Sequence, residues 1–540
     1  MRNDIVLYDF ANSPCARRVK ISLIEKGMSF DREVVNLSLM EQKTPEYLRI
    51  NPNGLVPAMS HNGHTLFESS VICDYLEDLV DAAPLYPRSL DDRLAVRAWQ
   101  DLELAMAKDY RTLMYAMVMG PLHHIAYSRQ EFLDKAARAS DNPAHIAWED
   151  KIWRLQVLSP EEQAQYRKGL YQYVQTVEAA LAGRNYLVAE QFSLADVATY
   201  PRLKMFPIVG IPLSAVHFPN IARWMARMEQ RSSFASTQAD EEKALLKISG
   251  NGMLALIGKL VYTPERQRSW FQRLLLRVIK PVLRRKLASD TAEQTSHKRS
   301  LKKSQAQPTQ YASKAKIICL SEAERERLLS AKSAEESGLV LYGNADCPES
   351  ERLQWLLAAQ SIPYRWVEGA PAEHDGPGQP ALPLLIHGER RIANSLTIAE
   401  YLFGADSALS LFREQPLEQA KIRMWHAFDT GMHKELQPLK EGSAADSALY
   451  SREQGLAIIR EKLLLLDEAL SAGACLVGEA FSYADVALYS RMLSFERLGL
   501  ATLIDDYRHI RSWMALCSTQ LALWQRGVPK QKAAGSKNRG

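Results

Sequence analysis

The chain has 540 residues, of which 46% are hydrophobic and 24% charged. At about 150 residues per domain, this length predicts three or four domains and excludes a single core. No apolar run is long enough for a membrane-spanning helix, and the N-terminus lacks the apolar core of a secretory signal, so we expect a cytoplasmic protein. The six cysteines never form Cys-x-x-Cys, which excludes zinc ribbons and dithiol redox motifs. We expect no metal site.

The first part of the chain alternates strand and helix patterns. The predicted elements are a strand at 5–8, a helix at 16–26, a strand at 30–35, a third strand ending at Pro57, a fourth at 65–67, and a helix from Ser69. From residue 90 to about 235 the pattern is helical. The sequence therefore predicts a small mixed α/β layer followed by a bundle of helices.

An internal repeat then decides the architecture. Residues 6–18 align with 340–352, and 192–198 (Phe-Ser-Leu-Ala-Asp-Val-Ala) align with 481–487 (Phe-Ser-Tyr-Ala-Asp-Val-Ala). The spacing between motifs differs because the second copy has the Pro/Gly-rich run 368–380 in place of 36–54, and because the first carries extra residues within 119–159. The chain therefore contains two copies of one two-part module.

Both copies contain a helix-start pattern. Ser193 and Asp196, like Ser482 and Asp485, have the spacing of a capping box, in which the hydroxyl and the carboxylate satisfy backbone N–H groups at the first turn. We interpret these acids as structural.

The segment between the copies is strongly basic, with 13 Lys or Arg against three acids from 259 to 303. Residues 268–287 have the pattern of a basic amphipathic helix. Its apolar stripe is Phe271, Leu274, Leu275, Val278 and Val282, and its basic side chains are Arg273, Arg277, Lys280 and Arg284. We favour packing of the stripe against the rest of the protein; the alternative is contact with an anionic membrane surface. Nothing beyond charge indicates nucleic acid.

Four motifs in this order resemble the cytosolic glutathione transferase superfamily, in particular its tandem, two-copy bacterial members. They are Leu7-Tyr8 with Ser13-Pro14 and Arg18-Val19, the stretch 51–57, Glu68-Ser69, and the Ser193/Asp196 box. The resemblance implies two modules, each a thioredoxin-like α/β domain followed by an all-helical domain. The implied domains are 1–82 and 88–235 for copy one, a linker at 236–337, 338–405 and 411–528 for copy two, and a tail at 529–540. We expect 288–313 and the tail to be disordered.

Ser13 is the predicted catalytic residue of copy one. It stands where a strand ends and a helix begins, so unpaired N–H groups and the helix dipole would stabilise a thiolate there by about 0.3–1 kcal/mol. The resemblance implies that this thiolate belongs to the co-substrate glutathione and that Ser13 donates to it. Asn12 and Cys15 stay as alternatives.

The resemblance also implies the glutathione contacts of copy one. Val56-Pro57 would be a cis-proline turn that exposes backbone groups to the cysteinyl part, although cis X–Pro bonds are only about 5% of cases. Glu68 and Ser69 would hold the γ-glutamyl group, and Lys43 and Asn53 would lie near the glycine carboxylate.

In copy two, Cys347 replaces Ser13 and is followed by Pro348, which is similar to thiol-type transferases that form a mixed disulfide with glutathione. Leu382, Pro383 and Ser395 are retained, but Asn394 stands in place of Glu68. The acids beside Cys347 oppose a thiolate. We interpret copy two as weakened or degenerate, with a thiol site at Cys347 as the alternative.

The resemblance implies conjugation of glutathione to an apolar electrophile, a detoxification reaction, or glutathione-dependent thiol chemistry. Tyr110, Met114, Met117 and Val118 would line the electrophile side. The two copies could pair within one chain as a pseudo-dimer, with a homodimer as the alternative. A second interpretation is a non-catalytic protein of the stringent-starvation type, which has the transferase fold and binds RNA polymerase.

Overall fold

A computed structural model describes residues 4–250, 252–263, 265–297, 314–371, 382–405, 408–436, 439 and 452–526. The tail predicted at 529–540, the linker residues 298–313 and most of the Pro/Gly-rich run 368–380 lie outside the described residues. No helix in the described part of the chain is long and apolar enough to cross a membrane.

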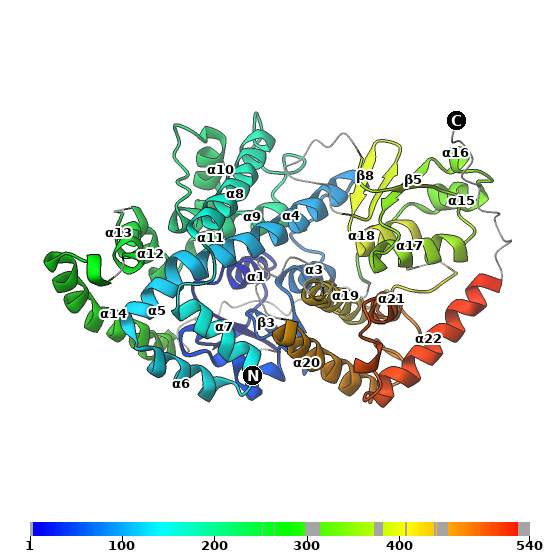
Figure 1. Ribbon diagram of the computed structural model, residues 1–540. Coiled ribbons are helices and arrows are strands. Elements are labelled where there is room, and N and C mark those ends of the chain that lie inside the picture. Colours follow the sequence, from blue (N-terminus) through cyan, green and yellow to red (C-terminus); the bar gives the residue numbers. More distant parts are fainter. Residues whose placement is uncertain are drawn as a thin grey trace, which may run out of the picture. The chain divides into compact units, whose positions relative to one another are not determined.

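The first module begins with a four-stranded mixed sheet in the order β2-β1-β3-β4 (Figure 1). Strand β1 pairs with β2 in parallel and with β3 antiparallel, and β3 pairs antiparallel with β4. The elements are β1 (Ile5–Asp9), α1 (Pro14–Glu25), β2 (Asp31–Val34), η1 (Leu37–Leu39), η2 (Glu41–Lys43), α2 (Pro45–Leu48), β3 (Ala58–His61), β4 (His64–Phe67) and α3 (Ser69–Leu79). This is the predicted thioredoxin-like layer.

The prediction of a third strand ending at Pro57 is wrong. Strand β3 begins directly after Pro57, and the preceding residues form short helices and a loop. Proline has no N–H to donate to a sheet ladder, and the Val56–Pro57 bond is cis, so this pair forms a turn into the strand.

Helices make up the rest of the first module. They are α4 (Leu90–Met114), the π-helix η3 (Tyr115–Met119), α5 (Gly120–Ala126), α6 (Arg129–Ala139), α7 (Pro143–Trp153), α8 (Pro160–Ala180), α9 (Leu194–Lys204), η4 (Phe206–Val209), α10 (Pro219–Glu229) and α11 (Ser232–Ser236). Helix α9 packs against α1 and α4 and so joins the sheet layer to the helices. Asp196, at the start of α9, accepts from the backbone N–H and hydroxyl of Ser193 and from the Trp224 indole. Burial raises the pKa of Asp196 to about 6.

The linker forms α12 (Asp240–Gly250), α13 (Met253–Tyr262), η5 (Glu265–Gln267) and α14 (Trp270–His297). Helix α14 contains Pro281 and extends through residues 288–297, which we predicted to be disordered. It packs along α5 in Figure 1, but through Leu276, Ile279 and Leu283. The favoured packing of the stripe named above is therefore wrong: Phe271, Leu274, Val278 and Val282 are exposed.

The second module repeats the architecture, with a sheet in the order β6-β5-β7-β8 and the same pairing directions. Two helices precede it, α15 (Glu322–Ser330) and α16 (Ala334–Ser337). Its elements are β5 (Leu339–Gly343), α17 (Pro348–Ala359), β6 (Arg365–Glu368), β7 (Leu384–His387), β8 (Arg390–Ala393), α18 (Ser395–Phe403), α19 (Pro416–Leu436), α20 (Arg452–Leu470), α21 (Tyr483–Arg497), η8 (Ala501–Leu503) and α22 (Arg508–Arg526).

The chain divides into two compact units that do not coincide with the two modules. One unit contains residues 1–316 together with 413–462, and the other contains 317–412 together with 463–540. The first unit thus includes α19 and the first part of α20, which belong to the second module by sequence. In this unit α19 packs on α3 and β4 (Figure 1).

Candidate functional site

The predicted glutathione residues of copy one come from three segments that meet at one edge of the sheet. Tyr8, near the end of β1, pairs with Ala58, and Ala58 pairs with Phe67 at the end of β4. The loop leading to Ser13, the Val56–Pro57 turn and Glu68 each lie within a few residues of this row. The register therefore brings the three motifs together.

Ser13 is the N-cap of α1. Its backbone is extended, and its hydroxyl accepts from the Ala16 N–H at 3.2 Å, which leaves the hydroxyl proton to donate elsewhere. Among the described residues, the side-chain oxygen of the neighbouring Asn12 is buried with no hydrogen-bond partner. Cys15 is half-buried on the first turn, and the Arg202 Nη2 group donates to its sulfur at 3.0 Å.

A buried ion network lies beneath this loop, and the sequence analysis missed it. The Glu103 carboxylate on α4 accepts from Arg18 at 2.5 Å and from Arg202 at 2.9 Å, and all three side chains are buried. The network ties α1 to α4 and α9 and so fixes the start of α1. The sequence does contain an indication of this network, since Arg18 and Arg202 both recur in copy two, as Arg352 and Arg491.

The loop before β3 is held by two hydrogen bonds to one carbonyl. The Tyr47 hydroxyl and the Asn51 amide donate to the Leu55 carbonyl at 2.7 and 2.6 Å. The next peptide bond, Val56–Pro57, is cis as predicted, and the aligned bond of the second module, Leu382–Pro383, is cis as well.

Glu68 and Ser69 mark the start of α3. Glu68 has a positive φ of 66°, an uncommon conformation for a residue with a side chain, and Ser69 is buried at the first position of the helix. The Glu68 carboxylate accepts from the Asn53 amide at 2.9 Å. In the described structure, the Glu68 side chain makes no hydrogen bond to the first turn of α3.

Lys43 is the last residue of η2, and its side chain lies beside Gly54. Gly54 has a φ of +58°, and a Cβ there would lie 3.0 Å from the Gln42 backbone oxygen and 2.8 Å from the Lys43 ammonium, so a residue with a side chain would be strained at this position. Burial lowers the pKa of Lys43, while Glu149 and Glu461 oppose the shift. Glu149 on α7 is itself buried, which raises its pKa to about 7. This carboxyl group falls in the extra segment of copy one and was not among the predicted site residues.

The second module supplies a cation to this region. The Lys462 ammonium on α20 lies 3.4 Å from the Asn53 side-chain oxygen and 4.9 Å from the centre of the Phe428 ring. Burial lowers its pKa, and Glu435, Glu68 and Glu461 oppose the shift. The sequence analysis missed Lys462 because pattern and spacing do not reveal contacts between distant modules.

The corresponding positions of copy two differ in one decisive respect. Cys347 is the N-cap of α17, in the same extended conformation as Ser13, and Ser395 is buried at the start of α18. Asn394 has a positive φ of 72°, like Glu68, but its side-chain oxygen accepts from the Leu396 N–H at 3.0 Å. Asn394 thus caps α18 with its own side chain.

The predicted electrophile wall is only partly available. Tyr110 and Val118 are buried, whereas Met114 and Met117 are half-buried. Tyr110 stacks on Phe206 and lies under the Arg202 guanidinium, so it belongs to the core.

Family models match most of these segments. Two models of the glutathione S-transferase N-terminal domain match residues 12–79 and 341–409, and a model of the C-terminal domain of the same enzymes matches 121–232 and 429–520. The chain belongs to the glutathione S-transferase superfamily. It is a tandem transferase in which two modules, each with an N- and a C-terminal domain, follow one another.

Individual relatives match one module or part of one. Glutathione S-transferase 1 of Dianthus caryophyllus is 41% identical over 87 residues, which is 16% of this chain and 39% of that protein. Glutathione S-transferase hmp2 of Hypomyces subiculosus is 24% identical over 239 residues, 44% of this chain and 98% of that protein. Among solved structures, the beta-etherase LigF of Sphingobium is 24% identical with a TM-score of 0.39, over 43% of this chain and 98% of that one.

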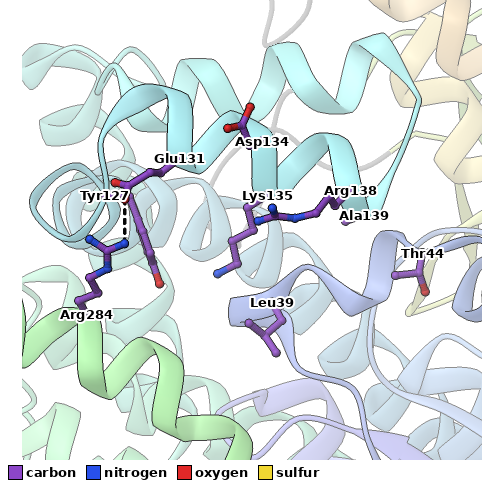
Figure 2. Close-up of a pocket in the computed structure, with 9 residues that line it drawn as sticks. All are labelled: Leu39, Thr44, Tyr127, Glu131, Asp134, Lys135, Arg138, Ala139 and Arg284. Atoms are coloured by element: carbon purple, nitrogen blue, oxygen red, sulfur yellow. Dashed lines mark hydrogen bonds and ion pairs between the residues drawn. The ribbon is translucent and has the colours of Figure 1, made fainter.

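A cavity of about 480 Å³ in the first transferase module lies apart from these residues. Figure 2 shows α6 on one side, the segment with Leu39 and Thr44 on another, and Arg284 of α14 on a third, where it donates to Glu131 at 2.7 Å. Lys135 and Arg138 add two cations. The lining includes none of the predicted glutathione contacts, so we do not assign glutathione to it.

Proposed function

We propose that this tandem protein is a glutathione transferase whose working site lies in the first module. In it, the Ser13 hydroxyl donates a hydrogen bond to the glutathione thiolate, which attacks an apolar electrophile. The second module is a structural partner with a weakened or degenerate site. Family membership and the names of the relatives support the general activity; the assignment of residues is our own.

The contrast between Glu68 and Asn394 carries the proposal. In copy one the first turn of α3 keeps its N–H groups for a ligand, since within the described chain the Glu68 side chain bonds to Asn53 instead. A helix N-terminus of this kind suits the carboxylate of the γ-glutamyl group, and Glu68 suits its ammonium. In copy two the Asn394 side chain occupies the equivalent N–H.

Charge supports the same choice. Glutathione at neutral pH has two carboxylates and one ammonium. Two ammonium groups lie beside the loop of copy one: Lys43 next to Gly54, and Lys462 of the second module 3.4 Å from the Asn53 oxygen. In copy two the region where α17 starts carries two acids beside Cys347, Asp346 and Glu349, where copy one has Asn12 and Cys15 beside Ser13.

Substitution of the two candidate residues tests the proposal. We expect Ser13→Ala to lose about 10²- to 10³-fold in kcat for conjugation of glutathione to an aryl halide, because one preorganised donor to the thiolate is removed. Cys347→Ser should keep this activity. Both variants are also assayed with a disulfide acceptor, and activity lost only in Cys347→Ser would assign thiol chemistry to copy two.

Folding must be separated from catalysis, since Ser13 also caps α1 and its removal costs about 1 kcal/mol. Ser13→Thr keeps a capping hydroxyl and is the matched control. Full activity in Ser13→Ala would refute the assignment. Failure of the wild type to bind immobilised glutathione, with no rise in melting temperature on adding it, would favour a binding protein of the stringent-starvation type.

A further inference from the structure

Helix α14 has two apolar faces, and only one of them is covered. Leu276, Ile279 and Leu283 face the protein and pack on a cluster that includes Ile125 and Val261. The second face is formed by Trp270, Phe271, Leu274, Val278 and Val282, which are 76%, 62%, 43%, 59% and 58% exposed. A row of large apolar side chains exposed to this degree marks a docking surface.

Positive charge lies beside this face. From Trp270 to Arg285 the chain has no acidic residue. Five basic side chains of this stretch are exposed, namely Arg273, Arg277, Lys280, Arg284 and Arg285. Four of them recur every three or four residues and so lie along one side of the helix, next to the exposed apolar face; they are Arg273, Arg277, Lys280 and Arg284. The combination of an apolar stripe and a cationic edge fits a surface that is apolar inside and anionic outside.

The way α14 is held indicates the shape of its partner. One side of the helix is fixed by α5 and α13, so a groove that would enclose the helix cannot form around it. What stays accessible is the side of the helix that carries Phe271, Val278 and Val282. An open face suits a flat partner, and among flat partners a bilayer interface accepts apolar side chains while its headgroups pair with Arg and Lys.

We propose that α14 binds the surface of an anionic lipid bilayer and lies parallel to it. Phe271, Leu274, Val278 and Val282 enter the boundary between headgroups and acyl chains, and Trp270 lies at the interface. Arg273, Arg277 and Lys280 along the helix edge pair with lipid phosphates, whereas Arg284 is already paired with Glu131. The helix does not span the bilayer, and the glutathione site of the first module plays no part in the contact.

Cosedimentation of the full chain with vesicles tests this proposal. We expect binding to vesicles of phosphatidylcholine with phosphatidylglycerol, weakening as salt is raised, and little binding to phosphatidylcholine alone. Phe271→Ser with Val278→Ser should lower the partition coefficient about tenfold or more, because two apolar side chains no longer enter the interface. Arg273→Gln with Arg277→Gln should lower it on anionic vesicles only.

Val216→Ser is the matched control, since Val216 is 87% exposed on the same unit but lies outside α14. All variants alter exposed side chains, so melting temperature and transferase activity should be unchanged. Absence of wild-type binding to anionic vesicles, or equal binding by the Phe271/Val278 variant, would overturn the proposal. Dimerisation of the wild type that this variant abolishes, without vesicle binding, would assign the face to a second copy.

Discussion

At the scale of single residues, Glu149 is the carboxyl group with the clearest consequence for pH dependence. It is buried beside Lys43 and Lys135, yet burial outweighs both cations and raises its pKa to about 7. Because this pKa lies above that of the unfolded chain, folding favours the protonated form. The contribution to stability is therefore complete at low pH and is lost as the pH rises through about 7.

We predict that the free energy of unfolding increases by about 1 kcal/mol between about pH 8 and about pH 6.5 on account of Glu149. Glu149→Gln should lose this increase, as measured by urea unfolding at the two pH values. The comparison ends at about pH 6.5 because burial lowers the pKa of His145 to about 4. At a pH below the ordinary pKa of histidine, His145 lowers the free energy of unfolding, because the unfolded chain binds the proton more readily. Glu161→Gln, at an exposed position, should behave as the wild type; an unchanged slope in Glu149→Gln would contradict the prediction.

Which residues could be predicted depends on how local their role is. The cis turn at Pro57 was predicted on the resemblance alone, and the structure has it, together with a cis bond at the aligned Pro383. The Arg18–Glu103–Arg202 network and Lys462 were missed. Their partners are far apart in sequence, and a buried charge looks like any surface charge until its neighbours are known. The roles of Ser13 and Cys347 stay predictions, since geometry alone does not test catalysis.

At the scale of elements, the contact of α19 with α3 includes a buried ion pair. The Arg423 guanidinium on α19 donates to the Asp78 carboxylate on α3 at 2.8 Å, and both side chains are 2% exposed. Burial raises the pKa of Asp78, and Arg423 opposes the shift. Removing the cation alone would leave a carboxylate buried without it.

We predict that Arg423→Met lowers the free energy of unfolding by about 3–5 kcal/mol, the usual cost of breaking a buried pair from one side. Adding Asp78→Asn to Arg423→Met should recover part of the lost free energy of unfolding, because no unpaired carboxylate is then buried. Lys314→Met removes an exposed pair with Glu414 and should cost under about 1 kcal/mol. Urea unfolding of the wild type, Arg423→Met, Asp78→Asn and the double variant measures the coupling. Strictly additive effects would show that the pair does not hold α19 to α3.

Elements were predicted best where one signal acted alone. The repeat and the helix-start boxes predicted both modules, and capping boxes begin α9 and α21. The third strand failed because an apolar stretch before a proline reads as a strand although its backbone turns. The prediction that the stripe on α14 packs against the protein was wrong because the helix has two apolar faces. Periodicity does not show which of them contacts the protein.

At the scale of the whole molecule, the duplication bears on whether the first module needs a second chain to pair with. Proteins of this superfamily typically pair as dimers, and here α19 of the second module already packs on α3 and β4 of the first. The Asn142 amide of α7 also donates to Glu461 on α20 at 2.8 Å. This face of the first module is thus covered by the chain's own residues and closed to a second chain.

We therefore predict a monomer of 60.9 kDa in solution, in which the two modules satisfy the pairing internally. Sedimentation equilibrium over a wide range of protein concentration measures the mass directly. A mass of twice this value would contradict internal pairing, unless the exposed face of α14 causes the association. Phe271→Ser with Val278→Ser distinguishes the two cases: a dimer that persists in this variant must use another face, and the covered surface of α3 would then have to open.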